Sequence, residues 1–355
     1  MKSTTLNITL VALCISGVAA IGLLAQAPPA GKKTGPGVQA AADEKEPDLL
    51  KTCKVPPPAR GGGGGRGRGA APAPAVKDVT IMEIPGVIAA GRKWNEVWHV
   101  TGNNADGIIA TKDGGLLIAQ NDNSNVIKLD KNGKESVAYS GLNTSGAVSM
   151  NAKGALFVNN RGLNESIEQL TPQKKTFANK INGGDPFDCA GTVLNDLTAA
   201  KNGNVYFTMG QVWWANPQGV VTKESENLNT NGIILSADEK TLFVTNGATL
   251  VAFDVQPDGS LKNQRDFAKL EAGGGGDGST IDSEGRIYVT SQATGIQVFS
   301  KDGKYLGVIP TPRPVISAAF SGKDKRTLYA VSRLGDEDWL ISIPMVSQGF
   351  KGRAK

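Results

Sequence analysis

Four oxygen-bearing side chains occupy equivalent places in successive segments of this chain: Asp106, Asn195, Asn231 and Asp277. Each lies eight or nine residues before a turn residue that leads into a short β-forming run. Two carboxylates and two amide oxygens that converge on one point would suit a hard divalent cation, Ca²⁺ first. Such a cation stabilises negative charge that develops on oxygen during hydrolysis. Because Asp-Gly and Asn-Gly pairs are also common in turns, turn formation is the alternative interpretation.

The elements that would position these residues recur six times. The turn residues that mark the copies lie 40, 49, 37, 45 and 41 residues apart, and they are Gly114, Gly154, Gly203, Lys240, Gly285 and Arg326. A period of about 40–50 residues with several short strands in each copy is typical of a β-propeller. We therefore predict an all-β, six-bladed propeller with four-stranded blades over residues 77–350. An N-terminal strand from residues 75–91 is expected to close the ring.

The segments before the repeats have other compositions. Residues 1–27 carry Lys2, an apolar run and small residues at Ala25 and Ala27, which is the layout of a cleaved secretory signal peptide. Residues 28–76 are rich in Pro, Gly and Ala and predict a disordered tether. We therefore expect an exported protein, periplasmic or secreted, with no membrane span after cleavage.

The net charge of +5 arises outside the repeats. The tether holds eight Lys or Arg and four Asp or Glu, and the remaining positive charge is Lys2, so the repeats are neutral. Nucleic acid is therefore not an expected partner. Cys53 and Cys189 remain after signal removal; an exported protein could pair them, although two free thiols are slightly favoured.

The glycine run before Asp277 reads "GGGGDG". It lacks the Lys-Ser or Lys-Thr of a phosphate-binding loop and opens no helix, so it is interpreted as the approach to a strand that points Asp277 inward.

Three stretches together resemble the senescence marker protein (regucalcin), gluconolactonase and luciferin-regenerating family of six-bladed propellers. They are "NGIILSADEKTLFVTNG", "GDGSTIDSEGRIYVTSQATGIQVFSKDGKYLGVIPTP" and "AAFSGKDKRTLYAVS". The resemblance covers most of residues 100–350. It implies a divalent-metal hydrolase that opens a sugar lactone or another cyclic ester, with Ca²⁺ first and Zn²⁺, Mn²⁺ or Mg²⁺ as alternatives. The expected partner is therefore a small lactone or ester, and a monomer is expected.

The resemblance also assigns roles to residues. Asp106, Asn231 and Asp277 match the metal ligands, Asn195 faces the metal or the substrate, and Asp277 also accepts or donates the proton. Two departures stand out: Asp106 replaces the Glu that is usual in the family, and Val193 replaces an Arg of regucalcin that would clamp a sugar acid. Arg161 is a possible substitute for that Arg in substrate binding.

The competing hypothesis is a non-catalytic exported propeller that binds carbohydrate or protein partners, because a fold does not determine a function. Trp213 and Trp214 could stack on a sugar ring at the channel mouth or pack between blades. Asp185 and Asp188 lie in the longest interval, where an insertion could shape the pocket, or they could form turns.

Overall fold

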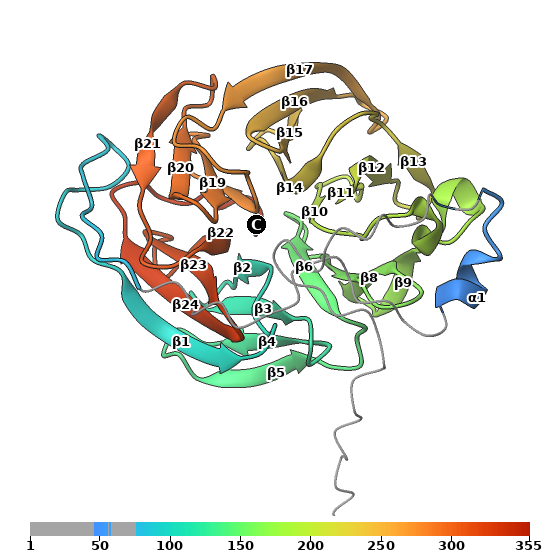
Figure 1. Cartoon of the computed structure of the whole chain (residues 1–355), viewed down its shortest axis with the longest axis horizontal. Helices are drawn as coiled ribbons and strands as arrows, with labels where there is room; N and C mark the ends of the chain where they lie inside the picture. The colour runs from blue at the N-terminus through green and yellow to red at the C-terminus, as the bar shows by residue number, and fades with distance from the viewer. Residues whose placement is uncertain (1–45, 56, 58–75) are drawn as a thin grey trace, which may run out of the picture.

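The structure is a computed structural model that describes residues 46–55, 57 and 76–355. Its strands form six four-stranded antiparallel sheets around a central axis, as Figure 1 shows. The innermost strands of neighbouring sheets contact one another all the way around the ring. The predicted six-bladed β-propeller is therefore confirmed. The predicted signal peptide and most of the predicted tether lie outside the described residues.

Each of the first three blades runs in chain order from the axis outwards. The strands of the first blade are β2 (Ile108–Ala110), β3 (Leu116–Gln120), β4 (Asn125–Leu129) and β5 (Glu135–Tyr139). Those of the second are β6 (Ser145–Met150), β7 (Leu156–Asn160), β8 (Ser166–Thr171) and β9 (Lys175–Ala178). Those of the third are β10 (Leu197–Ala199), β11 (Val205–Met209), β12 (Gln211–Ala215) and β13 (Val221–Lys223).

The remaining blades follow the same rule until the ring closes. The strands of the fourth blade are β14 (Thr230–Leu235), β15 (Thr241–Asn246), β16 (Thr249–Val255) and β17 (Leu261–Lys269). Those of the fifth are β18 (Ser279–Ile281), β19 (Ile287–Ser291), β20 (Gly295–Phe299) and β21 (Tyr305–Ile309). The sixth combines β22 (Val315–Ser321), β23 (Thr327–Leu334) and β24 (Glu337–Pro344) with β1 (Asn95–Thr101).

The ring is closed by an N-terminal strand, but at a different place from the one predicted. β1 pairs antiparallel with β24, whereas the described residues of the predicted strand, 76–91, form only an isolated bridge between Ile84 and Ile88. Four apolar side chains of that run, Ile81, Ile84, Val87 and Ile88, are buried in the cluster between the fifth and sixth blades. Side chains that are buried on several sides suit packing in the core. β1, in contrast, consists of exposed and half-buried residues, as an outer strand does.

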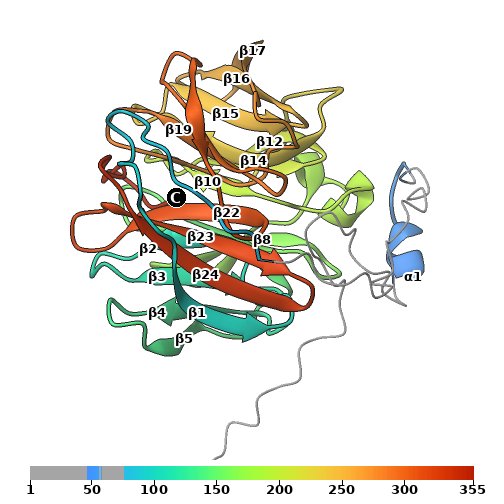
Figure 2. The ribbon, with the colours of Figure 1, turned by 60° about the vertical axis from the view of Figure 1, so that its left-hand side comes forward.

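The insertion in the longest interval of the repeat forms two 3-10 helices, η1 (Ile181–Gly183) and η2 (Phe187–Ala190). It contacts β13 and the short helix α1 (Glu46–Leu50). Figures 1 and 2 both place α1 outside the ring of blades. The insertion therefore lies at the rim of the propeller, where Asp185 accepts a hydrogen bond from the Lys54 backbone at 3.2 Å.

Cys53 and Cys189 form a disulfide, with their Cα atoms 5.7 Å apart. This corrects the preference for two free thiols. It also places residues 46–55, within the predicted disordered tether, against the propeller. The physical reason is that a covalent bond and the contacts of α1 with η2 offset the ordering entropy that composition alone would not.

The propeller was predicted to end at residue 350. In the structure, the segment that follows β24 still contacts the blades beyond that residue. It crosses from the sixth blade to the centre of the ring, where Figure 1 marks the end of the chain. On the way, Gly349 forms a bridge with Asp282 of the fifth blade and Ala354 forms one with Met150 of the second. Residues 345–355 therefore tie several blades together. In the part of the chain that the structure describes, no helix is long and apolar enough to cross a membrane.

We expect Cys53→Ser to lower the stability of the propeller by about 2–4 kcal/mol, because the disulfide restricts the unfolded chain between two distant residues. Thermal unfolding should show this as a lower midpoint, and a reductant should lower the midpoint of the parent protein but not that of the variant. Equal midpoints for the two oxidised proteins would show that the bond contributes nothing to global stability.

Candidate functional site

The predicted site residues meet at one end of the inner strands. Asp106, Asn195 and Asp277 each lie two residues before the inner strand of their blade, which is β2, β10 or β18, and Asn231 lies in β14. All four line one cavity at the axis, together with Arg161. Its volume is about 20 Å³, which is enough for one water molecule. The structure thus brings together every residue to which the sequence analysis assigned a site role.

The glycine that follows three of these residues has a spatial role. A Cβ on Gly107 would lie 2.7 Å from Ala147 Cα, one on Gly232 would lie 2.1 Å from the Asp277 carbonyl oxygen, and one on Gly278 would lie 2.8 Å from the Ile316 carbonyl oxygen. None of these glycines has a positive φ. The Asp-Gly and Asn-Gly pairs are therefore not turns here; they let neighbouring inner strands approach closely while the preceding side chain points into the cavity.

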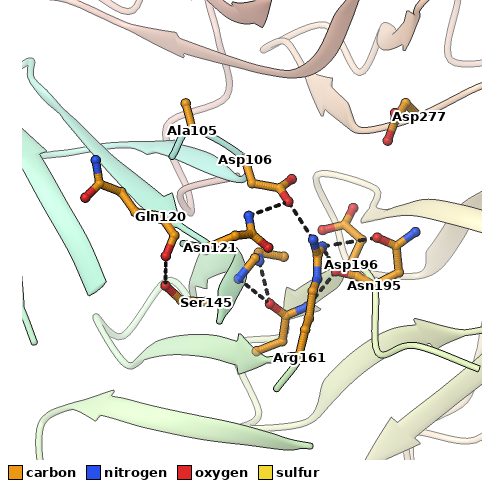
Figure 3. A network of polar contacts seen from close by, with 12 residues as sticks. Ala105, Asp106, Gln120, Asn121, Ser145, Arg161, Asn195, Asp196 and Asp277 are labelled. Atoms are coloured by element: carbon orange, nitrogen blue, oxygen red, sulfur yellow. Dashed lines mark hydrogen bonds and ion pairs between the residues drawn. The ribbon is translucent and has the colours of Figure 1, made fainter. Parts of the chain in front are cut away.

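An ion pair and hydrogen bonds link the first three blades across this cavity, as Figure 3 shows. The Arg161 side chain, which is only 7% exposed, donates from Nη1 to Asp106 Oδ2 at 2.5 Å. Its Nη2 donates to Asn195 Oδ1 at 3.1 Å and also to the Asn195 carbonyl oxygen. Asn121 Nδ2 donates to the same Asp106 oxygen at 3.0 Å. Arg161, which the sequence suggested for substrate binding, thus contacts two of the other predicted site residues.

The amide side chains continue the network. Asn195 Nδ2 donates to Asn231 Oδ1 at 2.8 Å, so the Asn231 oxygen is engaged and its Nδ2 group remains a donor. The backbone around Arg161 is held by buried carboxylates: Asp188 accepts from the Glu165 N–H at 3.0 Å, and Glu165 accepts from the Leu194 N–H at 2.9 Å. The insertion at the rim therefore supports the loops that carry Arg161 and Asn195 without lining the cavity itself.

Asp277 lies apart from the Arg161 network, as Figure 3 shows. Its hydrogen-bond donor is the Gln292 side chain, at 3.3 Å. Burial in the channel, together with the negative charges of Asp106 and Asp196, raises the pKa of the Asp277 carboxyl to about 7 against the opposing effects of Gln292 and Arg161. A carboxyl group with such a pKa can exchange a proton near neutral pH.

A second ion pair lies on the lining of the same cavity. Lys355 Nζ pairs with Asp196 Oδ1 and donates to the carbonyl oxygens of Leu197 at 2.8 Å and Ile233 at 2.9 Å. Its side chain is 8% exposed, and burial lowers the pKa of its ammonium group although Asp196 opposes that shift. This pair was not predicted from the sequence. Asp196 occupies the position at which three other blades have glycine, and this difference could have marked it as a site residue. No sequence pattern predicts that Lys355 lies at the axis.

The two tryptophans considered for sugar stacking do not line the cavity. Trp213 is buried and donates to the Met209 carbonyl oxygen at 3.0 Å, while Trp214 stacks on Tyr206. Trp213 belongs to an apolar cluster between the second and third blades, and Trp214 packs against one between the third and fourth, so the alternative of packing between blades holds.

The oxygen atoms of the cavity are already engaged by donors of the protein. Ca²⁺ requires about six to eight oxygen ligands at about 2.3–2.6 Å. Asp106 and Asn195 oxygens instead face the Arg161 guanidinium, and the Asn231 oxygen faces an N–H group. Within the described ranges, no group of three or more His, Cys, Asp or Glu side chains is placed to hold a metal ion. The side chains as arranged therefore do not fit a divalent cation.

Sequence comparison identifies the relatives of this chain. The family model described as SMP-30/Gluconolactonase/LRE-like region matches residues 139–333, more than half of the chain. The chain belongs to this family. The predicted resemblance is thereby confirmed.

Solved structures agree in fold. A putative gluconolactonase has a TM-score of 0.64 at 17% identity, covering 77% of this chain and 100% of its own. A gluconolactonase from Xanthomonas campestris has a TM-score of 0.63 at 21% identity, covering 78% of this chain and 98% of its own. The calcium-binding protein regucalcin from Agrobacterium tumefaciens has a TM-score of 0.57 at 16% identity, covering 74% of this chain and 97% of its own. At these identities the structures establish the shared propeller fold.

We expect Gly232→Ala to destabilise the protein by about 1–3 kcal/mol, because the added methyl group would overlap the Asp277 carbonyl oxygen. Gly275→Ala is the matched control, since the nearest atom to its added Cβ is 3.7 Å away and its φ is not positive. Urea unfolding of both variants measures the difference. Equal stability of the two would show that close strand approach does not explain the glycine.

We also expect Lys355→Met to cost about 3–5 kcal/mol, because it leaves the Asp196 carboxylate buried without its counter-charge. Adding Asp196→Asn should restore part of that loss, and chemical unfolding of the two single variants and the double variant measures it. A single variant as stable as the parent would rule out a structural role for the pair.

Proposed function

We propose that this chain is a lactonase-type hydrolase that opens a lactone or another cyclic ester in the central channel. Membership of the SMP-30/gluconolactonase family supports a lactonase-type function. The observation that carries the proposal is the convergence of Asp277, Arg161, Asn195 and Asn231 on a cavity the size of a water molecule. A proton acceptor and several N–H donors around one small polar cavity are what hydrolysis of an ester carbonyl requires.

The proposed reaction begins with a water molecule in the cavity. Asp277 accepts a proton from this water as the water oxygen bonds to the carbonyl carbon of the substrate. The carbonyl oxygen becomes an oxyanion, and N–H groups of Arg161 and Asn231 stabilise it. The ring C–O bond then breaks, and the proton held by Asp277 passes to the departing alkoxide oxygen. The product is an open-chain hydroxy acid, and Asp277 is again ionised.

The donors for the oxyanion are present before substrate binds. The guanidinium of Arg161 has five N–H groups, and three of them are used by Asp106 and Asn195. The Arg161 Nε is buried without a hydrogen-bond partner among the described residues. Because Asp106 and Asn195 already hold the guanidinium in place, little further ordering is needed when the oxyanion forms.

We further propose that the protein acts as an exported monomer. The signal-like composition of residues 1–27 supports export, and the Cys53–Cys189 disulfide suits an oxidising compartment such as the periplasm or the extracellular space.

We expect Asp277→Asn to lower kcat for lactone hydrolysis by about 10²–10⁴-fold, because Asn cannot accept the proton. The kcat/KM of the parent should rise with pH through about 7 and then level off, since Asp277 must be ionised to act as a base. Hydrolysis of a panel of γ- and δ-lactones, including sugar lactones, measures both effects.

Asp302→Asn, in an exposed turn, is the matched control and should retain parental rates. Full activity of Asp277→Asn would remove the proposed base. If the parent opens no lactone in the panel but still binds sugars or proteins, the non-catalytic propeller is the better description.

A further inference from the structure

The guanidinium of Arg161 occupies the place of a missing side chain. Gly146 is the counterpart in the second blade of Asp106, Asn195, Asn231 and Asp277. A Cβ on Gly146 would lie 2.1 Å from Arg161 Cζ and 2.2 Å from its Nε. Gly146 has no positive φ, so backbone conformation does not require glycine there. Space for the guanidinium is therefore the physical reason for this glycine.

The backbone around Gly146 is also held firmly. Asn159 Oδ1 accepts from the Gly146 N–H at 3.0 Å, and Asn159 Nδ2 donates to the carbonyl oxygen of Asn195. The Arg161 N–H donates to the Thr144 carbonyl oxygen at 3.1 Å. These bonds hold the backbone of Gly146, against which the guanidinium packs, and the backbone of Arg161 itself. The second blade therefore determines where the positive charge lies.

The positive charge lies among the oxygens that the family resemblance assigns to a metal. Arg161 contacts Asp106 Oδ2 at 2.5 Å and Asn195 Oδ1 at 3.1 Å. A divalent cation that shared these oxygens would lie beside a buried guanidinium. Two like charges at that separation in a site of low effective dielectric repel strongly. Ion and guanidinium therefore exclude each other from this position.

The charges that line the cavity are nearly balanced without an ion. Its lining holds three carboxylates, Asp106, Asp196 and Asp277, and two cations, Arg161 and Lys355. Asp106 pairs with Arg161, and Asp196 pairs with Lys355. Only one carboxylate of the lining lacks a cationic partner, so most of the negative charge that would attract a divalent ion is already neutralised.

We propose that Arg161 is the resident cation of this channel and takes the place of a divalent metal ion. A carbonyl or carboxylate oxygen of the ligand then binds guanidinium N–H groups, with the planar geometry that favours two parallel hydrogen bonds. The assignment of that oxygen to a lactone or ester rests on the proposed function. The claim that Arg161 excludes a metal ion does not rest on it and can be tested without any substrate.

The test compares thermal unfolding of the full chain after EDTA treatment, alone and with CaCl₂, MgCl₂, MnCl₂ or ZnCl₂. The midpoint of the parent should not change with any ion. Arg161→Met frees the Asp106 and Asn195 oxygens, so its midpoint should rise by roughly 5 °C at an ion concentration about 100 times the Kd. Arg161→Lys keeps the charge and should gain no response. Arg265→Met, at an exposed ion pair with Asp254, controls for loss of a positive charge.

An ion-dependent rise in the midpoint of the parent that Asp277→Asn abolishes would overturn the proposal, as would a folded Arg161→Met variant with no gain. If Arg161→Met does not fold, elemental analysis of the parent purified without chelator decides. One divalent metal ion per protein molecule would overturn the proposal, and less than about a tenth of an ion per molecule would support it. A metal-free parent that opens no lactone would contradict the proposed function while leaving the role of Arg161 intact.

Discussion

The close approach of the six inner strands is the constraint on which the rest of the molecule depends. Where these strands meet near the axis, Gly107, Gly232 and Gly278 have no room for a side chain, because backbone atoms of the next strand occupy that space. The residue before each glycine then points its side chain into the channel, since successive side chains of an extended chain alternate in direction. Strand packing and site chemistry are therefore two results of one geometry: the same contacts that close the ring place Asp106, Asn231 and Asp277 around a single cavity.

Within that cavity, the distribution of charge separates the roles of the side chains. Asp106 and Asp196 each have a cationic partner and serve to hold Arg161 and Lys355 in place. Asp277 has only the weak amide contact of Gln292, and burial and its acidic neighbours raise its pKa to about 7. The three carboxylates of this cavity thus have different roles because they have different partners. The two carboxylates with a cationic partner are structural elements, and Asp277 can take up and release a proton.

Much of this arrangement could be predicted from the sequence, because it repeats. The six turn residues, the β-forming runs and the oxygen-bearing positions share one period, and the fold followed from that period. What could not be predicted comes from contacts that do not repeat. β1 lies at residues 95–101 because the apolar run before it fits between two blades. The Cys53–Cys189 disulfide and the passage of Lys355 to the axis join segments that no local pattern relates. Arg161 was visible as a candidate, but its central place depends on the space above Gly146.

The pairing of Gly146 with Arg161 suggests how a propeller of this kind can change its chemistry without changing its fold. At this phase of the repeat, Asp106, Asn195, Asn231 and Asp277 line the channel, whereas in the second blade, at Gly146, a side chain is absent. Its absence admits a guanidinium that reaches Asp106 and Asn195 from a neighbouring loop. A metal ion offers its charge in several directions and exchanges with solvent, whereas a guanidinium is planar, covalently attached and always protonated. A site centred on Arg161 would therefore favour planar carbonyl and carboxylate groups and would not depend on ion supply. One glycine and one arginine, 15 residues apart in the sequence, are sufficient to specify that difference.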